Sequence, residues 1–564
     1  TVSTACSSAA NAIVTGALLL GSGMADYVVA GGTDALCRFT LNGFNSLSVL
    51  DREPCRPFDA TRAGLNLGEG AGYLVLTHER PGMRTYCRLA GYANANDAHH
   101  QTASSQTGEG AYRAMAGALA QSGLRRVDYI NVHGTATPNN DLTEGTALRR
   151  LLFRAAVQFD ERLHGACARR GGRHRGRIGG AGYHTRAALR QPRIRGADPG
   201  ARAAPRSTDA RGRRTFGALK FVRVRRQLLF VNLCKMKLYV NCITSGAGLR
   251  RDIKELIPEM NLRRRMSRVV KSGVAAGIES LLEFGDRAAV EAVVTATGLG
   301  CIADSEKFLD SLIANEERML NPTPFIQSTF NTVGAQIALL RGLHCYNTTY
   351  ANRWTSFENA LTDAALRIGA GLSQAVLVGA FDETTPSAGI ILQRLGVAQQ
   401  GGWGESSVFF VLTAEAFDTS VAAITGIRFP DGTAIGESAG TGRIQSREDA
   451  GTRTSAGGNA GREIPAGGSP GTGTASGNEE EPENATQSGE RRMVRASMSG
   501  VTPHFTAIAE VFRRVVAGEA GNTGKAGNIG NTGSIEDTGN AGQRIVLYND
   551  FPGSTVSAIE LTCM

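Results

Sequence analysis

The stretch Thr1-Val-Ser-Thr-Ala-Cys-Ser-Ser-Ala-Ala-Asn-Ala-Ile13 places a cysteine on the turn between a β-like run and an amphipathic helix. At the start of a helix, the free amide groups and the positive end of the dipole favour the thiolate form of Cys6. Its small neighbours leave room for a large acyl group. Most lone cysteines are small buried hydrophobic residues, but the motifs that follow favour a nucleophile.

A histidine stands downstream, in His133-Gly-Thr-Ala-Thr-Pro-Asn-Asn-Asp141. The run 127–133 predicts a strand that delivers His133 at its end, where active groups usually lie in α/β sheets. A thiolate nucleophile combined with a histidine in a polar loop indicates acyl transfer.

Residues 1–151 are typical of an α/β domain, with expected strands over 26–34 and within 68–77 and an expected helix over 109–123. Residues 236–427 show the same kind of α/β pattern and begin with an expected strand.

The chain contains an internal repeat. Adding 348 to the residue number aligns 3–34 with 351–382 without a gap, and Trp354 then occupies the place of Cys6. A shorter match is displaced by 336 residues. It aligns Gly68-Glu69 with Gly404-Glu405, and 75–77 with 411–413. We therefore expect the second half to carry a diverged copy of the helix and strands around Cys6.

The net charge of +10 is concentrated in one region. Between Leu151 and Lys235 there are 19 Arg and 2 Lys against 4 acidic residues, a net of +17, so the remainder carries −7. Basic stretches can bind phosphate backbones. This one lacks interleaved aromatic residues and a recognisable nucleic-acid-binding fold, so we expect no nucleic-acid partner.

The rest of the composition fits a reduced, cytoplasmic protein. The ten cysteines form no CxxC pair and have no zinc-like spacing, so neither a disulfide framework nor a metal site is expected. There is no signal peptide and no apolar run long enough to span a membrane. The chain opens inside a motif without Met, which indicates a fragment.

Two stretches are rich in Gly, Thr, Ser, Asn and Glu and are expected to be disordered insertions. The first is the low-complexity insertion 428–492. The second, 518–543, interrupts 493–564, which we interpret as the C-terminal part of the second module. Around it, 501–517 predicts a helix and 545–561 a final strand.

Together the motifs resemble those of the β-ketoacyl-ACP synthases of the thiolase-like superfamily. The resemblance covers residues 1 to about 151 and rests on four motifs: the Cys6 motif, Pro57-Phe-Asp-Ala60 with Arg62 and Gly64, Gly68-Glu-Gly-Ala-Gly72, and His133-Gly-Thr-Ala-Thr137 with Asn140, Asp141 and Glu144. It implies a layered α-β-α architecture, here in two incomplete copies.

The resemblance also implies a reaction, a decarboxylative Claisen condensation in fatty-acid, polyene or polyketide biosynthesis. Cys6 would accept an acyl chain, and the carbanion formed from malonyl-ACP would attack the resulting thioester. His133 would stabilise the enolate oxygen, the Cys6 amide would contribute to the oxyanion hole, and Thr135 and Thr137 would bind the pantetheine arm. No bound cofactor is implied, because the substrates are carried on the phosphopantetheine of acyl carrier protein.

The family also needs a lysine and a second histidine, which 152–235 does not supply in this frame. Back-translation shifted by one nucleotide restores a Lys/His motif and a Gly-Phe-Gly-Gly-Asn turn, and it ends in a stop codon that overlaps Met236. We therefore interpret 152–235 as a disordered, Arg-rich segment read out of frame, and we expect an impaired condensation activity.

The second module, with Trp354 in place of the cysteine, is similar to chain-length-factor partners of synthases. The expected partners are therefore acyl carrier protein and a synthase-like subunit in a homo- or heterodimer. The alternative function is that of a non-catalytic chain-length-factor-like partner or scaffold made of two thiolase-like halves.

Overall fold

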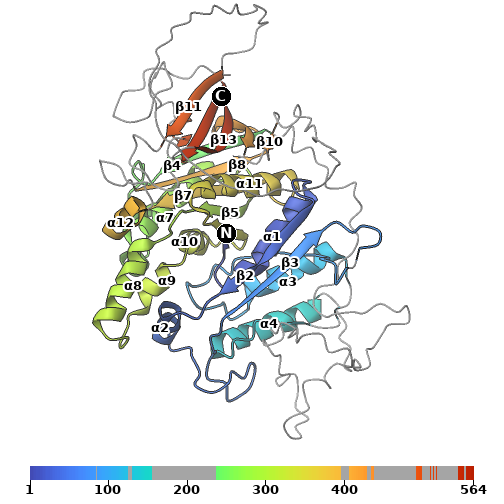
Figure 1. The fold of residues 1–564 in the computed structure, drawn as a ribbon, viewed down its shortest axis with the longest axis vertical. Coiled ribbons are helices and arrows are strands. Elements are labelled where there is room, and N and C mark those ends of the chain that lie inside the picture. Colours follow the sequence, from blue (N-terminus) through green and yellow to red (C-terminus); the bar gives the residue numbers. More distant parts are fainter. Residues whose placement is uncertain are drawn as a thin grey trace, which may run out of the picture.

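The computed structural model describes residues 1–83, 85–124, 127, 130–154, 237–394, 405–428, 434–436, 491–497, 544–551 and 554–564, and positions 509, 512, 513 and 516. We call 1–154 the N-terminal segment and 237–564 the C-terminal segment. They lie against each other in Figure 1, the first in blue and cyan and the second from green to red. The expected Arg-rich segment and both expected insertions lie almost entirely outside the described residues.

A mixed 11-stranded sheet organises the C-terminal segment, and its described strands run in the order β1-β6-β5-β7-β8-β4-β9-β13-β12-β11, with β10 on β9. The strands are β1 (Val2–Ser3), β4 (Leu238–Ser245), β5 (Val290–Ala296), β6 (Tyr346–Tyr350), β7 (Ala375–Asp382), β8 (Ser406–Thr413), β9 (Ser420–Arg428), β10 (Ala434–Gly436), β11 (Arg491–Ser497), β12 (Arg544–Phe551) and β13 (Ser554–Cys563). The β6-β5-β7 pairings are parallel, and β8 and β4 join antiparallel.

Helices cover both faces of this sheet. The long ones are α7 (Arg268–Phe284), α10 (Thr332–Arg341) and α11 (Ser356–Gly369). The shorter ones are α5 (Ile253–Leu256), α6 (Met260–Arg265), α8 (Ile302–Ala314), α9 (Pro322–Gln327) and α12 (Pro386–Arg394).

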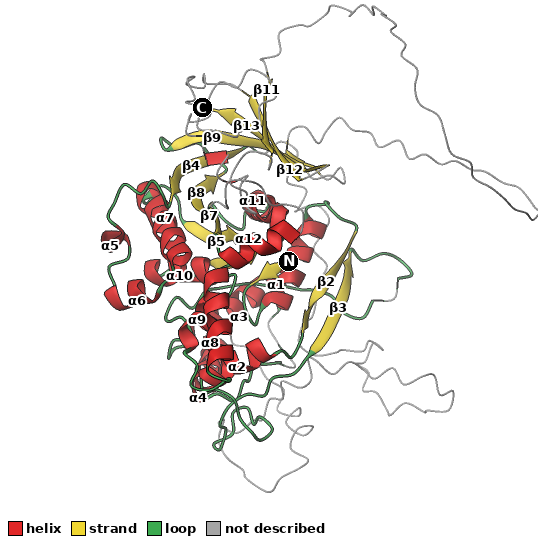
Figure 2. Ribbon diagram, turned by 60° about the vertical axis from the view of Figure 1, so that its left-hand side comes forward, coloured by secondary structure: helices red, strands yellow, loops and turns green. Residues whose placement is uncertain are grey.

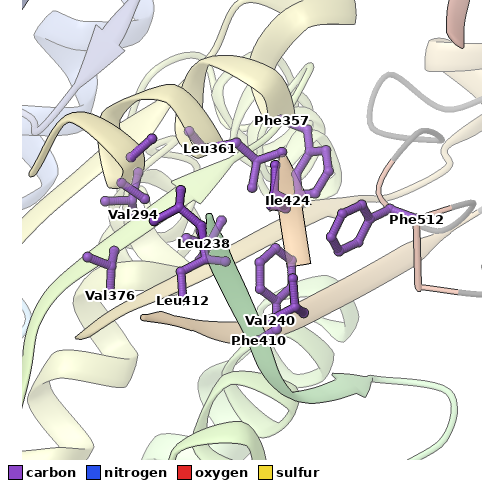
Figure 3. Packing of buried hydrophobic residues seen from close by; sticks show 14 of the residues in the cluster. Leu238, Val240, Val294, Phe357, Leu361, Val376, Phe410, Leu412, Ile424 and Phe512 are labelled. Carbon is purple, nitrogen blue, oxygen red and sulfur yellow. The ribbon is translucent and has the colours of Figure 1, made fainter. Parts of the chain in front are cut away.

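Alternate strand residues enter two separate cores, which is the period-2 pattern of a sheet buried on both faces. Val376, Val378 and Phe410 pack with α11 and Phe512 in the cluster that Figure 3 shows. Leu377 and Phe409 pack instead with α7 and α10. The segment is therefore layered α-β-α, as the resemblance implied.

The N-terminal segment contains α1 (Ser8–Gly21), β2 (Tyr27–Asp34), α2 (Arg38–Ser46), β3 (Gly70–Thr77), α3 (Glu109–Ser122) and α4 (Pro138–Arg154). Apart from β1, which joins the large sheet, its strands β2 and β3 pair only with each other among the described residues, as a two-stranded antiparallel ribbon. Figure 2 shows this ribbon standing apart from the large sheet, beside α1.

The internal repeat is confirmed element by element. Helices α1 and α11 have the same bounds after the shift of 348, and so do β2 and β7. Strands β3 and β8 coincide after the shift of 336. The antiparallel registers of β2–β3 and β7–β8 agree as well. Tyr27 pairs with Thr77, and their counterparts Ala375 and Thr413 pair with each other.

Two local predictions were wrong. Residues 130–133 form no strand, because no neighbouring strand in the described part of the chain is available to pair with them. The expected single strand over 545–561 is a pair of antiparallel strands, β12 and β13. Pro552-Gly553 lies between them, and a Pro-Gly pair is a turn signal that the prediction overlooked.

The two segments meet across an antiparallel pairing of β1 with β6. Val2 lies opposite Tyr350, its own counterpart in the repeat, so the pairing is symmetric about that position. Asn94 extends the junction, since its side chain donates to Asn11 Oδ1 at 2.8 Å and accepts from the Asn347 amide at 3.2 Å. At this junction the two copies therefore meet through equivalent residues.

Candidate functional site

Cys6 sits on a tight turn immediately before α1. Ala5 takes a left-handed backbone conformation with φ of 55°, which is costly for a residue with a Cβ. Ser8 stabilises the turn, because its hydroxyl donates to the Ala5 carbonyl at 2.6 Å and accepts from the Thr4 amide at 3.0 Å. The Cys6 side chain is exposed.

His133 lies beside Cys6, although the two residues are far apart in the sequence. The His133 imidazole is the main reason why the pKa of the Cys6 thiol is lowered, through hydrogen bonding first and through its charge second. The same hydrogen bond raises the pKa of His133, as do the carboxylates of Glu144 and Asp141. These opposite shifts favour a thiolate–imidazolium pair.

The loop that carries His133 is held by carboxylates from α4. Glu144 accepts hydrogen bonds from the backbone amides of His133 and Gly134, at 2.8 and 2.9 Å. Asp141 is buried and accepts from the amides of Ala136 and Phe58, at 3.1 and 2.6 Å. Helix α4 therefore sets the position of the histidine.

Thr135 and Thr137 occupy the same loop. Their hydroxyls are 2.9 Å apart, and the Thr137 amide donates to the Thr135 hydroxyl at 3.4 Å. Both side chains are partly exposed, so either hydroxyl could meet a ligand. Their assignment to the pantetheine arm stays a prediction.

Asp141 and Glu144 stand in the histidine motif of the sequence, which alone indicates no role for them. Their signal was present in the sequence, since acids in the first turns of a helix can bind the free amides of a preceding loop. The strained backbone of Ala5 left no signal, because alanine is not a residue that marks positive φ.

The second copy keeps the turn without the thiol. Arg353, the counterpart of Ala5, has φ of 52°, and the short 3-10 helix Arg353–Thr355 carries Trp354 at the nucleophile position. Ser356 donates to the Arg353 carbonyl at 2.9 Å and accepts from the Asn352 amide at 2.7 Å, as Ser8 does in the first copy.

The nearby cysteines of the C-terminal segment do not replace Cys6. Burial raises the pKa of the Cys345 thiol to about 11 and that of Cys301 well above its usual range. Burial also raises the pKa of Cys242. All three therefore favour the neutral thiol.

Other site types find no support in the described part of the chain. It contains no group of three or more His, Cys, Asp or Glu side chains arranged to hold a metal ion. None of its helices combines the length and apolar character needed to cross a membrane. A cavity of about 360 Å³ opens between α3 and α4, and its lining includes Tyr112, Leu119 and Leu151 but no candidate site residue.

The comparisons with known proteins agree with this layout. The profile of the β-ketoacyl synthase N-terminal domain matches residues 1–81, and that of the C-terminal domain matches 86–164. A second profile of the N-terminal domain matches residues 249–389.

Curated relatives match over a limited length. The 3-oxoacyl-[acyl-carrier-protein] synthase 2 of Rhizobium meliloti (strain 1021) is 42% identical over 172 residues, 28% of this chain and 41% of that protein. The mitochondrial 3-oxoacyl-[acyl-carrier-protein] synthase of Arabidopsis thaliana is 38% identical over 168 residues, 27% of this chain and 36% of that protein. The chain therefore spans less than half the length of these relatives.

Among solved structures, the PfaC keto synthase–chain length factor is similar with a TM-score of 0.54 and 14% identity, over 100% of this chain and 72% of that one. That likeness concerns the fold. The shared fold is α/β with a large mixed sheet. The profiles show that both segments belong to the β-ketoacyl synthase family.

Proposed function

We propose that the N-terminal segment accepts an acyl chain on Cys6, in the manner of a β-ketoacyl-ACP synthase of fatty-acid or polyketide biosynthesis. The observation that carries this proposal is the position of His133 beside Cys6, an exposed thiol directly before a helix, where the histidine lowers the thiol pKa. Thiolate attack on the thioester of acyl carrier protein forms acyl-Cys6 and releases the carrier thiol.

Condensation would then follow on the same thiol. Loss of carbon dioxide from a malonyl thioester gives a carbanion that attacks the acyl carbonyl, and the C–S bond to Cys6 breaks as the new C–C bond is completed. His133 would stabilise the enolate oxygen and the Cys6 amide the oxyanion. Thr135 and Thr137 would hold the pantetheine arm.

We further propose that condensation by this chain is impaired. The lysine and second histidine implied by the family resemblance are assigned to another reading frame of 152–235, and most of that region lies outside the described residues. Loss of a positioned acid–base group costs roughly 10²- to 10⁴-fold in rate. Sequencing the DNA around codons 145–240 tests the frame shift directly.

Mass spectrometry of the chain after incubation with acyl-ACP tests the first step. We expect an acyl adduct on Cys6 in the wild type and none in Cys6→Ala. Adding malonyl-ACP then measures condensation. An unmodified Cys6 would refute the acceptor role, whereas a rate equal to that of the Rhizobium relative would refute only the impairment.

The second candidate function is a silent, chain-length-factor-like role for the C-terminal segment. It is favoured by Trp354 at the nucleophile position and by the symmetric pairing of β1 with β6, which joins the two segments. The Cys6→Ala variant tests it. Acyl-ACP should then label no cysteine of the C-terminal segment, and a labelled Cys345 would overturn the role.

A further inference from the structure

The junction between the two segments brings counterpart residues of the internal repeat together at two places. Val2 lies opposite its counterpart Tyr350 in the pairing of β1 with β6. Helices α1 and α11 lie side by side (Figure 1), and Leu18 packs with its counterpart Leu366. A pairing of two C-terminal segments through the same face would therefore place each residue of a second α11 where its counterpart on α1 now lies.

Two buried charged side chains stand near this contact, and both belong to the C-terminal segment. Asp363 on α11 is 2% exposed and accepts a hydrogen bond from the Tyr346 hydroxyl at 2.9 Å. The guanidinium of Arg367 lies 3.8 Å from the centroid of the Tyr346 ring, and its Nε donates to the Ser373 hydroxyl at 3.3 Å. These contacts hold both charges within their own segment.

The N-terminal segment has neutral side chains at the equivalent positions. The counterparts of Asp363 and Arg367 are Thr15 and Leu19. Thr15 reaches the C-terminal segment, since its hydroxyl oxygen lies 3.5 Å from that of Tyr350. Burial and then the charge of Asp363 raise the pKa of Tyr350 well above its usual range. The Tyr350 hydroxyl therefore neighbours both Asp363 of its own segment and Thr15 of the other segment.

Pairing of two C-terminal segments would replace Thr15 by a second Asp363. Each Tyr350 hydroxyl would then adjoin two carboxylates with one proton to donate. Like charges buried together repel strongly, because little water is present to screen them.

We propose that Asp363 determines which partner the α11 face accepts. It disfavours a second C-terminal segment and favours a synthase segment that carries a short neutral residue at the position of Thr15, as the N-terminal segment does. Interfaces commonly gain specificity in this way, from a charge that only the wrong partner leaves uncompensated. The inference rests on the internal repeat and not on the chemistry of Cys6.

A charge placed on the N-terminal side tests the proposal within the full chain. Thr15→Asp puts two carboxylates at the junction, whereas Thr15→Asn has nearly the same shape without the charge. Leu366→Cys is the reporter, because Leu366 is 3% exposed and packs with Val14 and Leu18 of the other segment. We expect Thr15→Asp to speed alkylation of the reporter peptide at least tenfold and Thr15→Asn to leave it unchanged. Adding Asp363→Asn to Thr15→Asp should restore slow alkylation.

Self-association tests the discrimination itself. Leu18→Asp should open the junction and free the α11 face, because it puts a charge against Leu366. In sedimentation equilibrium, Leu18→Asp combined with Asp363→Asn should self-associate at least tenfold more tightly than Leu18→Asp alone. Asp304→Asn is the matched control in the same background, because Asp304 on α8 is also buried, at 7% exposed, and lies outside the α1–α11 contact. It should leave self-association unchanged.

Equal alkylation rates in Thr15→Asp and Thr15→Asn, or no restoration by Asp363→Asn, would overturn the proposal. Self-association that Asp363→Asn leaves unchanged, or that Asp304→Asn strengthens equally, would also overturn it. Cys6→Ala should leave alkylation of the reporter unchanged while losing the acyl adduct, which separates this proposal from the proposed function.

Discussion

Ala5 and Arg353 stand 348 residues apart in the chain and share a left-handed backbone, with φ of 55° and 52°. Each directly precedes the nucleophile position of its copy, which holds Cys6 in one and Trp354 in the other. The turn has thus been retained where the thiol has not. A strained turn at a functional site normally persists only when its surroundings determine it, and here Ser8 and Ser356 supply equivalent hydrogen bonds.

Substitutions of Ala5 should separate strain from side-chain effects. Ala5→Gly should keep the fold and leave the free energy of unfolding equal or slightly higher, because glycine takes positive φ without steric cost. Ala5→Val should lower it by about 1–3 kcal/mol, because a β-branched residue resists this conformation. Denaturant unfolding measures both values. Equal stability of the two variants would contradict the strained turn.

The reactivity of Cys6 should depend on His133. Because the hydrogen bond to His133 is the largest influence that lowers the Cys6 pKa, alkylation should reach half its maximal rate below the ordinary cysteine value of about 8.5. In His133→Ala this midpoint should move upward. The pH dependence of iodoacetamide labelling, followed at the Cys6 peptide, gives the midpoints.

His100→Ala provides the control for that experiment. His100 accepts hydrogen bonds from the Thr102 and Ala103 amides through Nδ1 and serves its own loop. Its removal should leave the Cys6 midpoint unchanged. A midpoint that stays in place in His133→Ala, or moves equally in both variants, would rule out a specific pair.

The sequence predicted the repeat and most of its elements because periodic apolar runs and glycine turns are local signals. It also predicted that His133 is a functional partner of Cys6. It could not predict the exposed ribbon, since Val29 and Val75 belong to ordinary buried-strand patterns, and they are exposed where no other described strand pairs with the ribbon. The failed strand at 130–133 has the same origin, because a strand depends on partners that its own residues do not encode.

Glu383 should make the stability of the C-terminal segment fall with rising pH. Burial, aided by Asp304 and Glu405, raises its pKa to about 7, although the Ala303 amide donates to it and Arg268 opposes the shift. The folded state therefore holds a proton that the unfolded state loses near pH 4.3. Stability is full below that pH and is lost progressively up to about pH 7.

Glu383→Gln should remove this dependence while keeping an acceptor for the Ala303 amide. As the pH rises from 4 to 8, the unfolding free energy of the variant should increase by about 1–3 kcal/mol relative to that of the wild type. Unfolding in urea at both pH values measures the gain. Glu109→Gln is the control without this dependence, because its hydrogen bond with Arg150 lowers the Glu109 pKa and this carboxyl is ionised in both states over most of the pH range. If the difference in unfolding free energy between wild type and Glu383→Gln is the same at both pH values, the raised pKa of Glu383 is refuted.

An aromatic cluster should couple the two segments energetically. Phe39 on α2 lies 5.1 Å from Phe308 on α8 and 5.7 Å from Phe325 on α9, measured between ring centroids. A double-mutant cycle of Phe39→Ala and Phe325→Ala should give a coupling of about 0.5–1.5 kcal/mol in unfolding free energy. The control pairs Phe39→Ala with Phe284→Ala, because the Phe284 ring contacts Phe417 within the C-terminal segment. If the two substitutions of the first cycle lower the unfolding free energy additively, the segments do not dock at these rings. Packed rings are coupled, because removing one changes the effect of removing the other.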